Sequence, residues 1–220
     1  MVRIATADGS GLAARLRTET AEDHRRAETS SFVTDLLDGA LGVSDYARLA
    51  VQHHAIYGEL ERAVAANDDP DLEPLLAPEL TRLGALEADL RFLLGDDWAS
   101  EAEVLPATRA YVDHLAEVCA TPEGLLAHHY LRYLGDLSGG QLIRRVLDRV
   151  YGFADGQGTA FYRFEAIPDP KGFKAAYRDH LDALDWSPER QQRVVDEVAA
   201  GFAATKAVFD DLAAETVPTI

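Results

Sequence analysis

Several residue types are scarce in this chain of 220 residues, and each shortage narrows what the protein can be. The one cysteine, Cys119, cannot form an intrachain disulfide, and it excludes metal sites built on several thiolates. No run of about 18 apolar residues occurs, so we expect no membrane anchor. The N-terminus lacks the apolar segment of a signal peptide. Together these features predict a soluble protein of the reducing cytoplasm.

Positive charge is also scarce. The chain has 21 Lys and Arg residues against 38 Asp and Glu residues, which gives a formal net charge of −17 and a pI of about 4.7. This balance argues against nucleic acid as a partner, because nucleic-acid binding depends on neutralising phosphates. Any anionic ligand must be held by a few local cations. The acidic surface suits a basic electron-donor protein.

What is abundant is helical periodicity, with apolar residues spaced three and four apart along most of the chain. We find no convincing strand, repeat or linker, so the sequence predicts one all-α domain of about eight helices over residues 1–220, with loose termini at 1–9 and 215–220. Ser10, Ser44 and Ser187 are the expected N-caps, and Pro78, Pro106 and Pro122 are expected to open helices. The expected helices run over 10–27, 44–66, 78–95, 106–119, 122–152, 173–184 and 187–212.

The segment LRYLGDLSGGQLIRR, residues 131–145, places three glycines inside a predicted helix. Each interior glycine costs a helix roughly 1 kcal/mol relative to alanine. LSGGQ is the signature string of ABC-type ATPases, but those proteins also need a phosphate-binding G-x-x-x-x-G-K-[ST] loop. No lysine here follows a glycine, which excludes that loop and the nucleotide interpretation.

The glycines therefore need another cause. Gly135 and Gly139 are four residues apart and share one helix face, whereas Gly140 permits a bend. Close packing of two helices is one explanation, and close approach of a flat, wide ligand is the other. The neighbouring Asp136 and Arg132, with two tyrosines, favour a ligand and a proton relay.

The seven histidines do not form a metal-binding motif, since neither Glu-x-x-His nor H-E-x-x-H occurs. A single axial histidine on a haem iron needs no such motif. His24 and His53 both lie on apolar stripes, where a core histidine is the default interpretation. His24 differs because Glu28, one turn later, can accept a hydrogen bond from its Nδ1–H. We interpret His128 and His129 as packing or surface residues.

The segment YLRYLGDLSGGQ, residues 130–141, closely resembles the signature of haem oxygenases. LRTETAEDHRRAE, residues 16–28, resembles their proximal helix, and the similarity extends to FKAAYRDHLDAL, residues 173–184, and to the last helix. The chain has no hydrophobic C-terminal tail, and in this it resembles the soluble bacterial type. The resemblance implies an all-α fold with haem sandwiched between a proximal N-terminal helix and a kinked, glycine-rich distal helix.

The resemblance also implies roles for individual residues. His24 matches the axial ligand of the haem iron and Glu28 its hydrogen-bond partner, while Gly135 and Gly139 match distal glycines that leave space for O2. Asp136 matches the aspartate that holds a distal water network. The network or the pocket wall includes Tyr57, Tyr130, Arg132, Tyr133, Ser138, Phe202 and Phe209, and the propionates lie near Arg17, Lys174 and Arg178. The chain departs from the family pattern at Ala21, Val33 and Thr205.

The implied reaction opens haem with O2 and external electrons, giving biliverdin of the alpha isomer, CO and Fe2+. Non-covalent haem b would be both cofactor and substrate, and the redox partner would be of the ferredoxin or flavoprotein reductase type. Iron acquisition and haem detoxification both remain open as purposes. Two alternatives are a haem carrier or sensor, which would share His24 without needing Asp136, and a helical adaptor with no ligand.

Overall fold

The computed structural model describes residues 11–153 and 156–216, and over these residues it contains helices and no strand. The all-α prediction is confirmed. The expected N-cap Ser10 lies outside the described residues. The α-helices are α1 (Leu12–Glu19), α2 (Ala21–Glu28), α3 (Ser31–Asp38), α4 (Val43–Ala66), α5 (Leu83–Leu94), α6 (Trp98–Glu101), α7 (Pro106–Val118), α8 (Pro122–His129), α9 (Gly135–Tyr151), α10 (Pro170–Ala183) and α11 (Pro188–Glu215).

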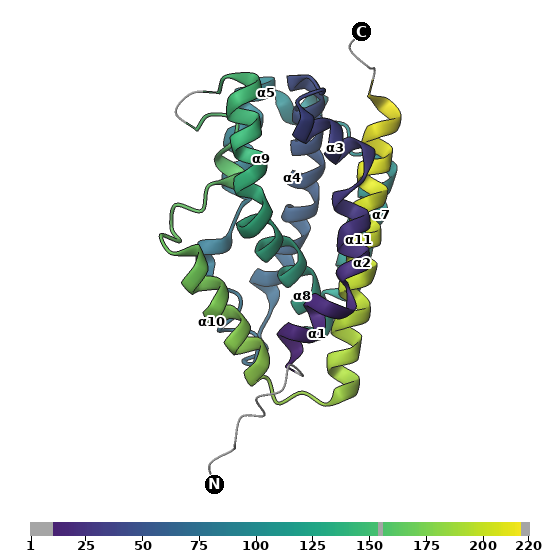
Figure 1. The fold of residues 1–220 in the computed structure, drawn as a ribbon, viewed down its shortest axis with the longest axis vertical. Coiled ribbons are helices and arrows are strands. Elements are labelled where there is room, and N and C mark those ends of the chain that lie inside the picture. Colours follow the sequence, from purple (N-terminus) through teal and green to yellow (C-terminus); the bar gives the residue numbers. More distant parts are fainter. Residues whose placement is uncertain (1–10, 154–155, 217–220) are drawn as a thin grey trace.

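The long helix α11 organises the bundle. It runs nearly the height of the molecule, with α2 and α3 lying along it, while α9 and α10 lie on the other side (Figure 1). Helix α11 also packs against α7 and α8, and α4 packs against α5 and α7. The apolar stripes read from the sequence therefore face one shared core, in which Leu16, Tyr57, Leu60 and Leu126 are fully buried.

Helices with strong local start signals begin where the sequence predicts. Pro106 opens α7, and Cys119 follows its last residue as the C-cap. Pro188 occupies the first turn of α11, and the Ser187 hydroxyl accepts a hydrogen bond from the Arg190 backbone N–H at 3.3 Å. These boundaries depend on capping chemistry within a few residues, and that chemistry can be read locally.

Three expected boundaries are wrong. The helix expected over 10–27 breaks at Thr20, a buried residue whose hydroxyl donates to the Leu16 carbonyl at 2.6 Å. Helix α4 begins after Gly42 rather than at Ser44, because the Asp45 carboxylate accepts from the Gly42 backbone N–H at 3.0 Å. Pro78 opens a 3-10 turn, and α5 starts only after Arg82.

The glycine-interrupted helix expected over 122–152 is divided in an unexpected place. Its irregular turn is the π-helical segment Tyr130–Leu134, which separates α8 from α9, whereas Gly140 lies inside regular α9. A π-helical turn adds a residue to the local helix and rotates the side chains that follow it. That turn sets which residues of α9 face the interior.

The C-terminal end of α11 is tied to the bundle. Glu215, expected to be part of a loose terminus, ends the helix and forms an ion pair with Arg48 of α4. Among the described residues, no helix is both long and apolar enough to cross a membrane.

Candidate active site

A cavity of about 550 Å³ lies between the N-terminal helices, α9 and α11. This volume is within the usual range for small-molecule and cofactor sites. Most of its walls are apolar, with polar groups at a few positions. The predicted site residues that line it are Arg17, His24, Glu28, Tyr130, Arg132, Gly135, Asp136, Ser138, Gly139, Phe202 and Phe209, together with Arg178.

Helix α2 places His24 and Glu28 on one wall. The imidazole Nε2 lies 3.3 Å from a Glu28 carboxylate oxygen, and the two side chains are 49% and 61% exposed because they face the open cavity. The edge of the His24 ring packs against Phe202 of α11, with centroids 5.2 Å apart. The expected contact through Nδ1 is therefore not the one observed. Since the imidazole is exposed, rotation about its χ1 and χ2 bonds can turn Nε2 away from Glu28 and free it for a ligand.

Helix α9 forms the opposite wall with bare backbone. A Cβ atom added at Gly135 or Gly139 would meet no heavy atom within 4 Å, so these two positions face open space. A Cβ at Gly140 would lie 2.8 Å from the Tyr162 ring. Gly140 thus serves close packing, and the predicted bend at this position is wrong. Packing therefore accounts for Gly140, whereas close helix packing does not account for Gly135 and Gly139, for which the approach of a flat ligand stays a prediction.

The carboxylate of Asp136 lies in the same wall and is held by a side chain of α4. The buried Tyr57 hydroxyl of α4 donates a hydrogen bond to it. Burial raises the pKa of Asp136 above its ordinary value, and the charge of Arg132 with the Tyr57 hydrogen bond opposes this rise. The carboxylate is thus positioned beside the cavity, where it can anchor water.

Arg132 is buried beside this pair with unused hydrogen-bonding capacity. Its Nε and Nη2 atoms have no hydrogen-bond partner within the protein, even though the residue is buried and only 6% exposed to solvent. Burial opposes its charge, but Tyr57 and Asp136 raise the pKa of the guanidinium above its ordinary value. A buried cation with free donors next to a cavity is suited to hold water or a ligand oxygen there.

Two predicted tyrosines support the wall from behind it. Tyr57 and Tyr133 do not line the cavity. Their rings pack edge to face at 5.4 Å, and Arg132 lies over the Tyr57 ring at 5.1 Å from its centroid. They therefore position Asp136 and Arg132 rather than contact a ligand.

Cations collect at one end of the cavity, as an anionic ligand in an acidic protein requires. Arg17 of α1 and Arg178 of α10 line it, and Tyr130 lies near both. Burial raises the pKa of Tyr130, while these two guanidinium groups oppose the rise. Lys174 does not line the cavity, and its ammonium donates to the Ser138 hydroxyl at 3.0 Å.

The structure adds residues that sequence analysis did not assign to the site. His53 of α4 is buried and lines the cavity, and burial, followed by the charge of Arg132, lowers its pKa well below the ordinary value. Its place on an apolar stripe favoured a core histidine, and the pattern could not show that the stripe borders a cavity. Tyr162 belongs to a short 3-10 turn and had no sequence signal at all. Thr205 and Val33, noted as departures from the family pattern, also line the cavity.

The chain is similar to known proteins over almost its whole length. The family model described as "Heme oxygenase" matches residues 10–211. "Heme oxygenase 1" of Synechocystis sp. is 38% identical over 95% of this chain and 88% of its own, and that of Rattus norvegicus is 37% identical over 92% and 72%. The crystal structure of heme oxygenase-1 from Synechocystis in complex with heme superposes with a TM-score of 0.85 at 39% identity, covering 92% of each chain.

These matches show the class of protein. The chain belongs to the heme oxygenase family, whose members are haem-degrading oxidoreductases, and it is an enzyme of that class. A further solved structure, the heme oxygenase of Leptospira interrogans, has a TM-score of 0.86 at 36% identity and covers 90% of this chain.

The residues that line the cavity fit a haem in their chemistry and arrangement. One wall offers an exposed imidazole, the opposite wall is bare backbone over which a flat ring can lie, and two arginines stand at one end. Each feature matches one part of haem, namely its iron, its plane and its carboxylates.

Proposed function

We propose that this protein, as a single domain, converts haem, O2 and electrons to biliverdin, CO and Fe2+, with opening at the alpha meso carbon. The observation that carries the proposal is the pairing of His24 on one wall with Gly135, Gly139 and Asp136 on the other. Such a cavity can hold a flat macrocycle by its metal and leave space for a small gas on the far side. Non-covalent haem is then the substrate, and its own iron supplies the chemistry that activates oxygen.

On the α2 wall, the neutral His24 imidazole would bind the iron through Nε2, with Nδ1–H donating to Glu28. An imidazole is a weaker electron donor than a thiolate, and a thiolate favours cleavage of the O–O bond. Glu28 would fix the ring orientation and the tautomer.

On the α9 wall, Asp136 would act through water rather than as a direct acid. Tyr57 holds its carboxylate at the cavity, and Arg132 offers two unpaired donors beside it. Water bound between these groups can deliver protons to the open face above Gly135 and Gly139. Because Gly135 and Gly139 have no side chains, the space above this face stays open to a small molecule such as O2.

At the cavity's end, Arg17 and Arg178 would pair with the propionates, and Lys174 would contribute from beside Ser138. These contacts would fix which meso carbon lies under the glycines. External electrons would come from a ferredoxin or a flavoprotein reductase, for which the acidic surface is suited.

The test is reconstitution of the purified protein with haemin, followed by a reductant and air, monitored by absorption spectra. Formation of biliverdin supports the proposal, stable ferrous haem indicates a carrier or sensor, and no Soret shift indicates an adaptor. The variant Asp136→Ala further distinguishes an enzyme from a haem carrier or sensor. We expect it to keep haem binding and thermal stability but to lose about 100-fold in the rate of ring opening, which corresponds to about 2.7 kcal/mol. His24→Ala should lose the nitrogen-ligated ferric spectrum, which added imidazole should partly restore.

A further inference from the structure

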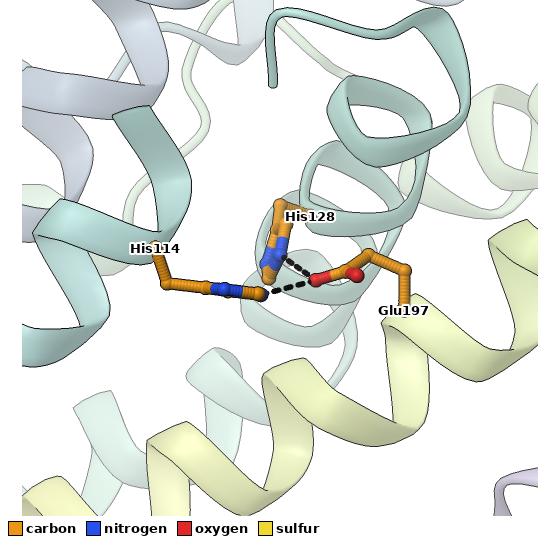
Figure 2. A group of neighbouring side chains, drawn as sticks. All are labelled: His114, His128 and Glu197. Carbon is orange, nitrogen blue, oxygen red and sulfur yellow. Dashed lines mark hydrogen bonds and ion pairs between the residues drawn. The ribbon is translucent and has the colours of Figure 1, made fainter. Parts of the chain in front are cut away.

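A second cluster of chemically active side chains lies outside the haem cavity. His114 of α7, His128 of α8 and Glu197 of α11 converge from three helices, and none of them lines the cavity. Figure 2 shows both imidazole rings pointing toward the same carboxylate. The Glu197 Oε1 atom lies 2.5 Å from His114 Nε2 and 2.9 Å from His128 Nε2.

The positions of these atoms suit a small metal ion. The three ligand atoms all lie within 4.8 Å of one another. Tetrahedral Zn2+ with bonds of about 2.0–2.1 Å requires ligand atoms about 3.3 Å apart. The two distances from Glu197 Oε1 to the imidazole nitrogens are shorter than this by less than 1 Å, so small rotations of Glu197 and of the two histidines would be needed to admit the ion. Two histidines and one carboxylate are an established ligand type for Zn2+.

The least exposed ligand is held in a metal-binding orientation. The Nδ1 atom of His128 is hydrogen-bonded to the Tyr111 hydroxyl at 3.0 Å, and the imidazole is completely buried. In the structure Nε2–H donates to the Glu197 carboxylate; once a metal displaces that proton, Nδ1–H can donate to the Tyr111 hydroxyl and Nε2 offers its lone pair to the ion. Gly201 of α11 leaves space for this ring, because a Cβ atom at that position would lie only 3.0 Å from His128 Cε1.

The outer side of the cluster is accessible. The His114 side chain is 36% exposed and that of Glu197 is 20% exposed, so an ion and one water can reach the site.

We propose that His114, His128 and Glu197 bind one Zn2+ ion, with a water molecule as the fourth ligand. The ion clamps α7, α8 and α11 together at the helix that leads into the distal wall of the haem cavity. Its role is structural, since the site does not face the cavity. The proposal does not depend on the proposed function, because the ligands are separate from every residue assigned to haem.

The test uses the full-length, tag-free protein after removal of metals by chelation, both without haem and loaded with haem. Titration with ZnCl2 by calorimetry should give one site per chain with a Kd of about 1 µM or tighter. Co2+ in place of Zn2+ should give the intense visible absorption of a four-coordinate nitrogen and oxygen site. A thiolate charge-transfer band would instead point to Cys119. Saturating Zn2+ should raise the Tm by about 4 °C or more.

Variants identify the ligands. His114→Ala and Glu197→Gln should each weaken Zn2+ binding about 100-fold and abolish the Co2+ spectrum, with unchanged helical content. Tyr111→Phe leaves all three ligands in place and should weaken binding about tenfold, because outer-shell partners contribute that much. The exposed His180 of α10 provides the matched control, and His180→Ala should bind as the unmodified protein does.

Two results would overturn the proposal. One is the absence of binding tighter than about 100 µM, which would make the cluster a hydrogen-bonded triad only. The other is binding that survives both His114→Ala and Glu197→Gln, which would place the ion elsewhere on the acidic surface. Failure of the protein to bind haem would leave either result readable, since the haem-free protein is titrated as well.

Discussion

Glycine serves opposite purposes near the starts of two successive α-helices, α8 and α9. At Gly124, in α8, an added Cβ atom would lie 2.1 Å from the Val118 carbonyl oxygen, so the missing side chain allows two segments of backbone to touch. At Gly135 and Gly139, in α9, an added Cβ would meet nothing within 4 Å. Packing requires the first glycine, whereas the other two leave the helix face open toward the cavity.

Two histidines differ in the same way, one enclosed by packing and the other facing the cavity. His129, at the end of α8, is buried between Tyr133 and Tyr177, and its Nδ1 is hydrogen-bonded to the Tyr177 hydroxyl at 2.9 Å. His24 faces the cavity with half of its side chain exposed. A histidine enclosed in the packed region stabilises the fold only while it is neutral, whereas one facing the cavity is free to bind a ligand.

The largest effect is expected where packing is tightest. Gly124→Ala should lower the free energy of unfolding by about 3 kcal/mol, because the rigid Val118 carbonyl cannot move aside. The matched variant Gly135→Ala should instead stabilise the apoprotein by about 1 kcal/mol, since alanine is the better helix former and the space is open. Urea denaturation of both variants measures the difference. Equal losses of stability would remove the distinction between the two regions.

A larger side chain on the open face should affect the ligand and not the fold. Gly139→Leu should weaken haem binding at least about 100-fold, equivalent to about 2.7 kcal/mol, because leucine occupies the space above the ring. Its Tm without haem should stay equal to that of the unmodified protein or rise. Soret titration measures the affinity, and Gly139→Ala provides a graded control. Unchanged affinity in the leucine variant would show that haem does not lie against this wall.

The effect that is smallest at neutral pH, and grows only as the pH is lowered, concerns protonation in the packed region. Burial lowers the pKa of His129 from 6.5 to about 3, so the unfolded state binds one more proton between these values. Stability must therefore fall as the pH is lowered from about 6.5 toward 3, by about 1.4 kcal/mol per pH unit from this histidine. His129→Phe should reduce the slope of unfolding free energy against pH by that amount, whatever its effect at pH 7. An unchanged slope would show that His129 takes up a proton in the folded protein.

Parts of the fold could be predicted because their signals are local. The start of α11 depends on a serine cap and a proline within two residues, and α7 depends on Pro106 in the same way. The break at Thr20 and the π-helical turn at Tyr130–Leu134 have no such signal. Both occur where a helix changes direction to fit its neighbours, and the free energy for this comes from packing with residues distant in the sequence.

The sequence by itself determined the helical class, the acidic surface, the loss of helix stability at the three glycines and the resemblance that singled out His24 and Asp136. Each of these depends on residue type, on spacing along one helix, or on a match over a continuous segment. Only the tertiary structure decided that Gly140 packs against Tyr162 while Gly139 stays open, that His53 borders the cavity, and that His114, His128 and Glu197 meet. The reason is physical. Spacing along a helix shows which side chains share a face, but what that face meets depends on how the other helices pack around it.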